Sequence, residues 1–485
     1  MQWALDLAST RVLALFLETI RNPVGFQEAL AEAQRRDIPV VALKVGASER
    51  GREAVRTHSE GIAGEDAVYE ALFEAYGVHR VSSMDEMADT LELFATGRAA
   101  TAPGLGAVHD SGGERALLID TADRVGVSLP DVSEATARRL AEALDPGLEP
   151  SNPVDAWGTG RDAEAVFVEC LLALADDPVV GALAFCVDLT PEERPDDAYS
   201  RAAFTVAGKT EKPMVVLGNL ATTIDPIQAG RLREGGVPVL EGTETGMRAV
   251  RHLFDHHRRS TLPALGPRVT PPAPGGTPDF EGEIAALAVL SSYGIPTSSP
   301  RPARSEDALQ DAASGLGYPL VLKTTAFDHK TEVGGIVLGL ADEAAMLSAY
   351  RDLSARLGPE VVVARQVPPG VEIGLGMVTD DQFGPVVIVS AGGTLIELMA
   401  DRVSLLPRVD RARALRALDR LRIRPLLDGA RGADPVDIDA LADVIVRFSE
   451  LALDVAGFID SIDVNPVIVG PDGAVAVDAL MTGRR

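Results

Sequence analysis

Apolar runs and helix-like stretches alternate at the start of the chain. Residues 11–18 are typical of a buried strand, residues 24–36 of a helix and residues 38–46 of a second buried strand. Together they predict one βαβ crossover with parallel strands. A parallel sheet of two or three strands leaves faces and edges uncovered. We therefore expect either that another polypeptide or a second copy of the chain completes it, or that the reading frame begins too late.

Residues 104–258 have the pattern of a complete doubly wound domain, in which strands and helices alternate. Ligands of such sheets bind at the carboxyl ends of the strands. The first strand leads through Asp110 to Ser111, Gly112 and Gly113 at the start of a helix. Unpaired N–H groups there can bind an anion, although an ordinary βα turn explains the same residues. The strand candidates are residues 104–110, 180–188, 212–219 and 237–241.

A proline-rich segment separates this part from the last third of the chain. Prolines at 263, 267, 271, 272, 274 and 278 favour an extended tether. Helices are predicted beyond it at 281–293 and 305–314, and each is followed by a glycine. Apolar residues at alternate positions from 371 to 377 indicate a half-buried strand. This layout fits two unequal αβ lobes that hold a nucleotide between them.

Composition limits the ligands that the chain can bind. The formal net charge of −27 argues against nucleic acids and anionic membranes as partners, because the protein's field repels polyanions. Any nucleotide or CoA site therefore needs local positive compensation. Cys170 and Cys186 have apolar neighbours, as expected for reduced core residues of a cytoplasmic protein. No apolar run approaches the roughly 18 residues of a membrane span, and the first residues do not begin a signal peptide.

The last third also carries the residue types of a magnesium–nucleotide site. Lys323 follows an apolar run and should emerge at a strand end, beside a turn that Gly334 and Gly335 permit. Asn465 and Asp478 flank a hairpin-like turn and offer oxygen ligands for Mg²⁺. Each of these signals alone is usually structural. Their order and spacing favour a nucleotide site.

Two segments carry a resemblance: VLKTTAFDHKTEVGGI, which contains Lys323, Gly334 and Gly335, and SIDVNPV. Through them, residues 281–485 resemble the ATP-grasp domain of the NDP-forming acyl-CoA synthetases, relatives of succinyl-CoA synthetase. The segment THSEGIAGEDAVYEALFEAYGV resembles that family's active-site histidine loop. The resemblance implies that His58 is the phosphorylated nucleophile and that Asn465 and Asp478 bind Mg²⁺. It also makes Asp463 a partner of the phosphohistidine. The family's N-terminal CoA-binding domain has no counterpart here.

Further candidates follow from the same resemblance. Glu18 matches the carboxylate that orients the nucleophilic histidine, although a surface glutamate at a strand end explains it equally well. His329 resembles a second histidine that relays phosphate in some ADP-forming members, and a structural role in its loop is the alternative. Glu372 is a further candidate for nucleotide contact. The helix N-terminus at Ser111 should grip the phosphohistidine, with Glu114 as a competing charge.

Three more histidines have helical spacing suited to a metal. No further ligands accompany them in the sequence, so they are expected to complement the C-terminal end of a helix dipole. They are His252, His256 and His257.

The predicted fold is α/β, with flavodoxin-like parallel sheets followed by an ATP-grasp domain. The expected parts are a partial succinyl-CoA-synthetase-like domain at 1–98, a complete one at 99–258, a linker at 259–280 and the ATP-grasp domain at 281–485.

The implied activity is an ADP-forming acyl-CoA ligase that uses ATP, Mg²⁺, CoA and a small carboxylic acid. A non-catalytic, regulatory nucleotide-binding subunit is the alternative. A homo-oligomer or a separate CoA-binding subunit is the expected assembly.

Overall fold

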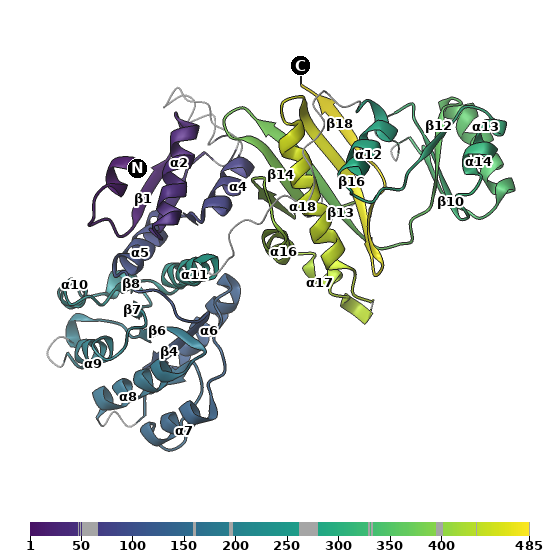
Figure 1. Cartoon of the computed structure of the whole chain (residues 1–485). Helices are drawn as coiled ribbons and strands as arrows, with labels where there is room; N and C mark the ends of the chain where they lie inside the picture. The colour runs from purple at the N-terminus through teal and green to yellow at the C-terminus, as the bar shows by residue number, and fades with distance from the viewer. Residues whose placement is uncertain are drawn as a thin grey trace. The chain divides into compact units, whose positions relative to one another are not determined.

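The chain has a mixed α/β architecture in this computed structural model (Figure 1), which confirms the predicted fold class. Its contacts divide it into two compact units. The first is drawn from Met1–Ala63 and Tyr76–Leu262, and the second from Gly64–Ala75 and Pro263–Arg485. The structure describes residues 1–46, 48, 50, 66–158, 162–193, 197–260, 280–327, 330, 333–393, 401–432 and 434–484.

The first unit begins with the predicted βαβ crossover. A three-stranded parallel sheet has the order β1-β2-β3, and α2 connects its first two strands. Asn22 caps α2 by accepting a hydrogen bond from the Gly25 N–H at 3.0 Å, and proline occupies the first helical position. Among the described strands β1 pairs with β2 alone, so its other edge is open. The elements are α1 (Gln2–Leu5), β1 (Leu13–Leu17), α2 (Pro23–Arg35), β2 (Val40–Lys44), β3 (His79–Val81) and α5 (Met84–Ala95).

A second parallel sheet of the same unit has the order β5-β4-β6-β7-β8. The chain moves outward from β4 to β5 and then returns to β6, so the topological switch point lies between β4 and β6. The four predicted strands are present, whereas the two-residue β5 was not foreseen. The strands are β4 (Gly104–His109), β5 (Val154–Asp155), β6 (Val180–Cys186), β7 (Met214–Gly218) and β8 (Val239–Glu241). The helices are α6 (Gly112–Val125), α7 (Glu134–Ala143), α8 (Ala163–Asp176), α9 (Ala198–Ala207), α10 (Pro226–Glu234) and α11 (Thr243–Ser260).

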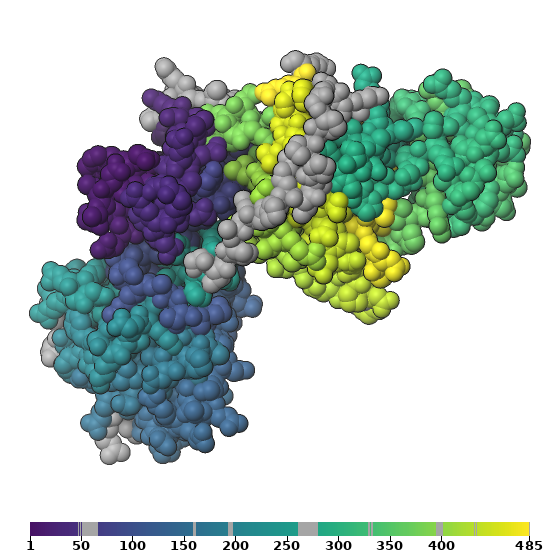
Figure 2. Space-filling view, viewed as in Figure 1, coloured from purple at the N-terminus to yellow at the C-terminus, as the bar shows by residue number. Residues whose placement is uncertain are grey.

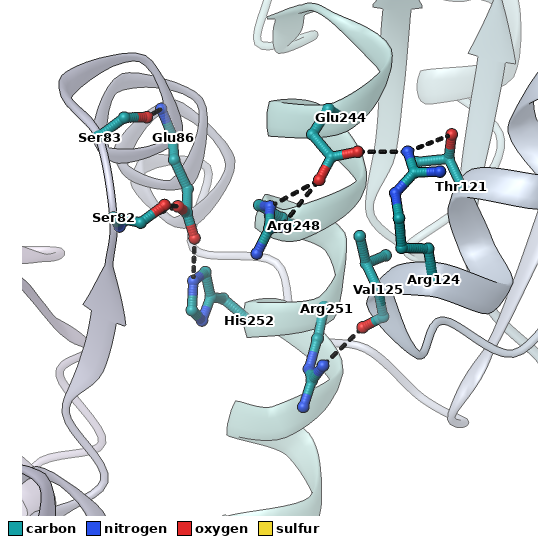
Figure 3. A network of polar contacts seen from close by, with 10 residues as sticks. All are labelled: Ser82, Ser83, Glu86, Thr121, Arg124, Val125, Glu244, Arg248, Arg251 and His252. Atoms are coloured by element: carbon teal, nitrogen blue, oxygen red, sulfur yellow. Dashed lines mark hydrogen bonds and ion pairs between the residues drawn. The ribbon is translucent and has the colours of Figure 1, made fainter.

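Helix α11 connects the two sheets of this unit by polar contacts on both of its sides (Figure 3). On one side His252 Nε2 lies 3.0 Å from Glu86 Oε1 of α5. On the other side Arg251 donates to the Val125 carbonyl of α6 at 2.6 Å. The expectation that the histidines of α11 mainly complement its dipole is therefore wrong for His252. It is wrong for His256 too, which contacts Asp37 and His79.

The second unit contains two antiparallel sheets, which form the two predicted lobes. The smaller has the order β11-β10-β12-β9, and α13 and α14 cover one of its faces (Figure 1). The larger has the order β15-β14-β13-β16-β17, with β18 paired to β16 and α18 across one face. In the space-filling view the smaller lobe is the teal-to-green mass at the right (Figure 2).

The predicted helices at 281–293 and 305–314 and the strand at 371–377 are present as α12, α13 and β13, and the predicted turn joins β16 to β17. The first lobe comprises β9 (Arg301–Ala303), α13 (Glu306–Ala313), β10 (Leu320–Thr324), β11 (Ile336–Leu340), α14 (Glu343–Leu357) and β12 (Val361–Arg365). The second comprises β13 (Val371–Asp380), β14 (Gly384–Ala391), β15 (Arg402–Leu405), α16 (Arg411–Asp419), α17 (Arg424–Leu427), α18 (Ile438–Val455), β16 (Ile459–Gly470), β17 (Gly473–Ala476) and β18 (Leu480–Gly483). Helix α12 (Gly282–Ser292) precedes both lobes.

Helix α4 (Asp66–Tyr76) belongs by its contacts to the second unit, although it comes early in the chain. The ring of Tyr69 meets Phe383 edge to face, with centroids 5.9 Å apart. Glu70 pairs with Arg420 at 2.8 Å on the surface of the same unit. The sequence pattern did not indicate this grouping.

Two sequence expectations concern the environment of the chain. Cys170 and Cys186 are buried and free, and burial raises the pKa of the Cys170 thiol to about 12. Both cysteines are therefore core residues, as predicted. Within the described ranges, no helix has the length and apolar character that a bilayer span requires.

Candidate nucleotide site

Lys323 lies in β10, between β11 and β12. Its ammonium was expected to emerge at the strand end. Instead it is buried, with 7% of the residue exposed, and donates to Glu283 Oε1 at 2.7 Å and to the Val477 carbonyl at 2.6 Å. The expectation is wrong because α12 and the segment after β17 cover that face of the strand, which the local pattern does not reveal.

Two residues that sequence reasoning missed complete a buried charge cluster with Lys323. They are Glu283, in the first turn of α12, and Lys330. Lys330 Nζ lies 3.0 Å from Glu283 Oε2 and 3.3 Å from each carboxylate oxygen of Asp478. One feature of the sequence could have revealed Glu283: it is a glutamate at the start of an apolar helix, where a buried charge needs a partner.

Electrostatics within the cluster keep Lys330 charged. Burial acts to lower its pKa, but the charges of Glu283 and Asp478 outweigh burial and raise the pKa above its ordinary value. The pKa of Asp478 is raised, mainly by burial and then by the charge of Glu283, while Lys323 and Lys330 oppose the rise. The described groups thus form a compact set of two ammonium groups and two carboxylates.

The predicted glycine turn follows Lys330 in the chain and leads into β11. Gly334 has a φ of +62°, a conformation that favours glycine. The Gly335 N–H donates to the Lys330 carbonyl at 2.7 Å, and its own carbonyl accepts from the Thr324 N–H at 2.8 Å. A Cβ at position 335 would lie 2.5 Å from Thr324 Cγ2, so only glycine fits. The turn therefore holds Lys330 beside the end of β10.

Two oxygen-bearing side chains meet at the end of β14: Asn465, a predicted magnesium ligand, and Glu372, which was predicted to contact the nucleotide. Asn465 Oδ1 accepts from the Gly393 N–H at 3.0 Å. A Cβ at Gly393 would overlap with Glu372 Oε2, so this carboxylate reaches the same residue. The Val477 N–H donates to the Pro466 carbonyl at 3.1 Å, which links the segments that carry Asn465 and Asp478.

These side chains suit Mg²⁺ in ligand chemistry. No group of three or more histidine, cysteine or acidic side chains among the described residues is arranged to hold a metal ion. Glu372, Asn465 and Asp478 nevertheless supply hard oxygen atoms of the kind that Mg²⁺ prefers, and Mg²⁺ usually completes its shell with phosphate and water. The residues fit a metal that binds together with a nucleotide.

The N-terminus of α6 is more acidic than the sequence analysis expected. Ser111 caps the helix, with its Oγ 3.5 Å from the Glu114 N–H, and a Cβ at Gly112 would lie 2.7 Å from Asp155 Oδ2. Burial raises the pKa of Asp110, and the nearby charges of Asp188 and Asp155 raise it further. These carboxylates gather because the switch point collects residues at the carboxyl ends of β4, β5 and β6. They compete with an anion at this helix end.

His109, at the end of β4, was not singled out by the sequence analysis. It is 1% exposed, and neither ring nitrogen has a hydrogen-bond partner among the described residues. Burial, helped by the charge of Arg115, lowers its pKa to about 4, so it is neutral at physiological pH. No sequence signal distinguishes it from an ordinary strand residue.

The remaining predicted site residues are placed only in part. His58 and His329 lie outside the described residues. Glu18 directly follows β1, and Asp463 lies in β16 opposite Gly376 of β13 and Leu480 of β18. Their predicted roles stay predictions.

Comparisons with known proteins agree with the two-part architecture. Residues 1–94 match the succinyl-CoA ligase-like flavodoxin domain family, and residues 280–482 match an ATP-grasp domain family. A trans-feruloyl-CoA synthase from an unknown prokaryotic organism is 29% identical over 501 residues, which cover 100% of this chain and 70% of that protein. A solved acetyl-coenzyme A synthetase 1 of Ca. Korarchaeum cryptofilum, in complex with coenzyme A, is 33% identical, with a TM-score of 0.40. It covers 42% of this chain and 93% of its own.

Acetate-CoA ligase [ADP-forming] I of Archaeoglobus fulgidus is 30% identical over 498 residues, which cover 98% of this chain and 70% of that protein. Some related ligases, such as those of Pyrococcus furiosus, are divided into alpha and beta subunits. Relatives that match along nearly the whole chain, from Archaeoglobus fulgidus and Methanocaldococcus jannaschii, are named ADP-forming acetate-CoA ligases, and a purely regulatory role is not favoured. The chain belongs to the family of ADP-forming acetate-CoA ligases.

Proposed function

We propose that this chain catalyses the ADP-forming ligation of a small carboxylic acid to CoA, with ATP as the phosphoryl donor. The observation that carries the proposal is the buried pair Lys323 and Lys330 beside the Gly334–Gly335 turn. Two ammonium groups provide the positive charge that a nucleotide's phosphates require, and the glycine turn holds Lys330 in place. The relatives that match along the whole chain supply the reaction class.

In this proposal Lys323 and Lys330 bind the phosphates, and Glu372, Asn465 and Asp478 hold Mg²⁺. A bound Mg²⁺ would supply neutralisation of the phosphate charge. The chain's own part is to orient the terminal phosphoryl group and to exclude water from it. Asp478, which contacts Lys330 in the described structure, changes its partner when the metal and nucleotide bind.

The covalent step is assigned to His58. A neutral imidazole nitrogen attacks the γ-phosphorus, the bond to the β–γ bridging oxygen breaks, and ADP leaves. The acid's carboxylate oxygen then attacks the phosphorus and frees the imidazole, which gives an acyl phosphate. The CoA thiolate finally attacks the acyl carbon and releases phosphate.

The supporting residues have assigned roles in these steps. Glu18 orients the imidazole, and Asp463 faces the phosphohistidine near the nucleotide. His329 is a candidate relay. The α6 N-terminus, with Ser111, Gly112 and Gly113, is proposed to grip the phosphohistidine, although the carboxylates around it compete with an anion.

A separate polypeptide or segment is proposed to supply the CoA site. The open edge of β1 supports this, because Phe16 on that strand is 56% exposed and the strand's outer hydrogen-bonding groups have no partner strand among the described residues. A second copy of the chain is the alternative occupant of this edge.

Phosphate labelling tests the covalent step. The protein is incubated with γ-labelled ATP and Mg²⁺, and a base-stable, acid-labile label on the protein is measured. His58→Ala should abolish the label, while His257→Ala, a histidine change in α11, should keep it. Label that survives His58→Ala but disappears in His329→Ala would move the nucleophile to His329. Nucleotide binding without any label would contradict the catalytic proposal.

A further inference from the structure

We infer that Glu283 is a positioning residue of the nucleotide site, because its carboxylate holds the ammonium groups of Lys323 and Lys330 side by side. The inference rests on the proposed nucleotide function and adds a residue that does not itself contact the nucleotide. Glu283 acts through the two lysines, which would meet the phosphates as a fixed pair.

Glu283 forms a bridge between the two lysines, with one carboxylate oxygen on each. Glu283 Oε1 lies 2.7 Å from Lys323 Nζ, and Oε2 lies 3.0 Å from Lys330 Nζ. The side chain of Glu283 is 4% exposed, and each lysine side chain is 9% exposed. Water therefore has little access to these three groups, and each depends on the others for its charge balance.

The backbone around the bridge is held firmly at both ends. Glu283 lies in the first turn of α12, and Ala286 and Leu287 in the next turn belong to the core of the larger lobe. Lys323 lies in a strand with neighbours on both sides. The carboxylate thus fixes the lysines relative to both lobes of the second unit, between which a nucleotide is expected to lie.

Glu283 and Asp478 should behave differently when a nucleotide binds. Asp478 also contacts both lysines, at 3.7 Å from Lys323 and 3.3 Å from Lys330, but its side chain is 25% exposed and it is a proposed Mg²⁺ ligand. A carboxylate that turns to a metal ion can no longer balance the lysines. Glu283 then remains as the counter-charge that keeps two neighbouring ammonium groups from repelling each other.

Stability alone does not account for the bridge. Burying an ion pair costs about as much desolvation energy as its attraction returns, so apolar side chains of similar volume would serve a purely structural purpose as well. A carboxylate that reaches two lysines with separate oxygens instead specifies where both ammonium groups lie. Such fixed placement is the property that electrostatic stabilisation of phosphoryl transfer requires.

The test is the affinity for a fluorescent ADP analogue in the Glu283→Gln protein. We expect its Kd to rise at least tenfold, whereas Glu281→Gln, which changes an exposed carboxylate at the N-cap of the same helix, should stay within twofold. Glu283→Asp keeps the charge but shortens the side chain. It should recover part of the affinity, because one lysine can still be held.

Partial recovery in Glu283→Asp is the readout that a merely structural role would not supply, because it depends on a carboxylate that still reaches a lysine. Wild-type affinity in Glu283→Gln would overturn the inference. Failure of the wild-type protein itself to bind the analogue would instead overturn the proposed function.

A double-mutant cycle gives a second check, and Glu283→Asp covers the case in which Glu283→Gln folds poorly. Lys330→Gln and Lys330→Gln/Glu283→Gln are compared for binding of the same analogue. If Glu283 acts through the lysines, the second substitution should lower the affinity by much less than it does in the wild-type background. Fully additive losses would count against the inference.

Discussion

Glu283 and Lys323 form a buried ion pair with 2.7 Å between Oε1 and Nζ, although 40 residues separate them in the chain. The contact connects α12 to β10. Lys330 joins the same carboxylate through its second oxygen. The charges that the proposed reaction needs are therefore neutralised and held in place before any nucleotide is present.

Replacing Lys323 should weaken nucleotide binding directly. In Lys323→Met a charge-assisted hydrogen bond to phosphate is lost, and such bonds contribute about 1.5 to 3 kcal/mol, equivalent to roughly a 10- to 100-fold rise in Kd for ADP. Isothermal titration calorimetry measures the change. Lys209→Met, which alters an exposed lysine of the first unit, is the control and should bind ADP normally. Equal affinity in both variants would remove Lys323 from the site.

Glu372→Gln should change the magnesium requirement more than the nucleotide affinity. The amide keeps the side chain's size beside Gly393 but removes the negative charge that favours Mg²⁺. We expect the half-saturating Mg²⁺ concentration for phosphoryl transfer to rise at least fivefold, while ADP binding without Mg²⁺ changes little. An unaltered Mg²⁺ dependence would show that Glu372 is no ligand.

The contact between Glu86 and His252 should make the first unit sensitive to acid. Burial acts to raise the pKa of Glu86, but hydrogen bonds from His252 and Ser82 outweigh burial and lower it to about 2. A carboxyl group with a depressed folded-state pKa contributes stability above its ordinary pKa of 4.5 and loses that contribution as the pH falls towards 2.

Glu86→Gln should therefore lower the free energy of unfolding at pH 7 by roughly 2 to 3 kcal/mol. The difference from wild type should shrink as the pH falls from 4.5. Urea denaturation at several pH values measures it, with the exposed Asp85→Asn as the control. A difference that does not depend on pH would contradict the assigned cause.

The raised pKa of Asp89 predicts the opposite dependence of stability on pH. Burial, with the charges of Glu92 and Glu241, raises its pKa from 3.8 to about 6, although the Glu241 N–H donates to it at 2.9 Å. A carboxyl group with a raised folded-state pKa stabilises the protein while it is protonated, and this contribution is lost as the pH rises through about 6.

Asp89→Asn should accordingly raise the free energy of unfolding at pH 8 by roughly 1 to 3 kcal/mol and have little effect near pH 4. Thermal unfolding at the two pH values tests this. The exposed Asp120→Asn on α6 should show neither effect. A destabilised Asp89→Asn protein at pH 8 would mean that the charged form is favoured in the folded state.

The attachment of α4 to the second unit should depend on apolar packing more than on its surface ion pairs. Tyr69 is fully buried against Phe383, so Tyr69→Ala should destabilise this unit by roughly 3 to 5 kcal/mol. Arg420→Ala breaks a partly exposed pair with Glu70 and should cost less than about 1 kcal/mol. Denaturant unfolding followed by circular dichroism compares the two. Equal losses would contradict this ranking.

The sequence by itself determined most of the elements, because their signals are local. Apolar runs predicted β4, β6, β7 and β8. The pattern also predicted that a glycine follows the end of α12, and Gly294 lies there with a positive φ. The β16–β17 hairpin followed from Pro471, Asp472 and Gly473. Motif spacing also led to the family that the comparisons then showed.

Only the tertiary structure decided which charges meet. Glu283 and Lys330 come together with Lys323 because α12 and the Gly334–Gly335 turn converge on one strand, and neither pairing has a local periodic signal. The carboxylates at the α6 N-terminus likewise gather from the ends of β4, β5 and β6, since strand order rather than chain order sets their distances. Helical and strand periodicity report which face of an element is buried. They do not report which distant residue lies opposite that face, and the chemistry of the site depends on those opposing residues.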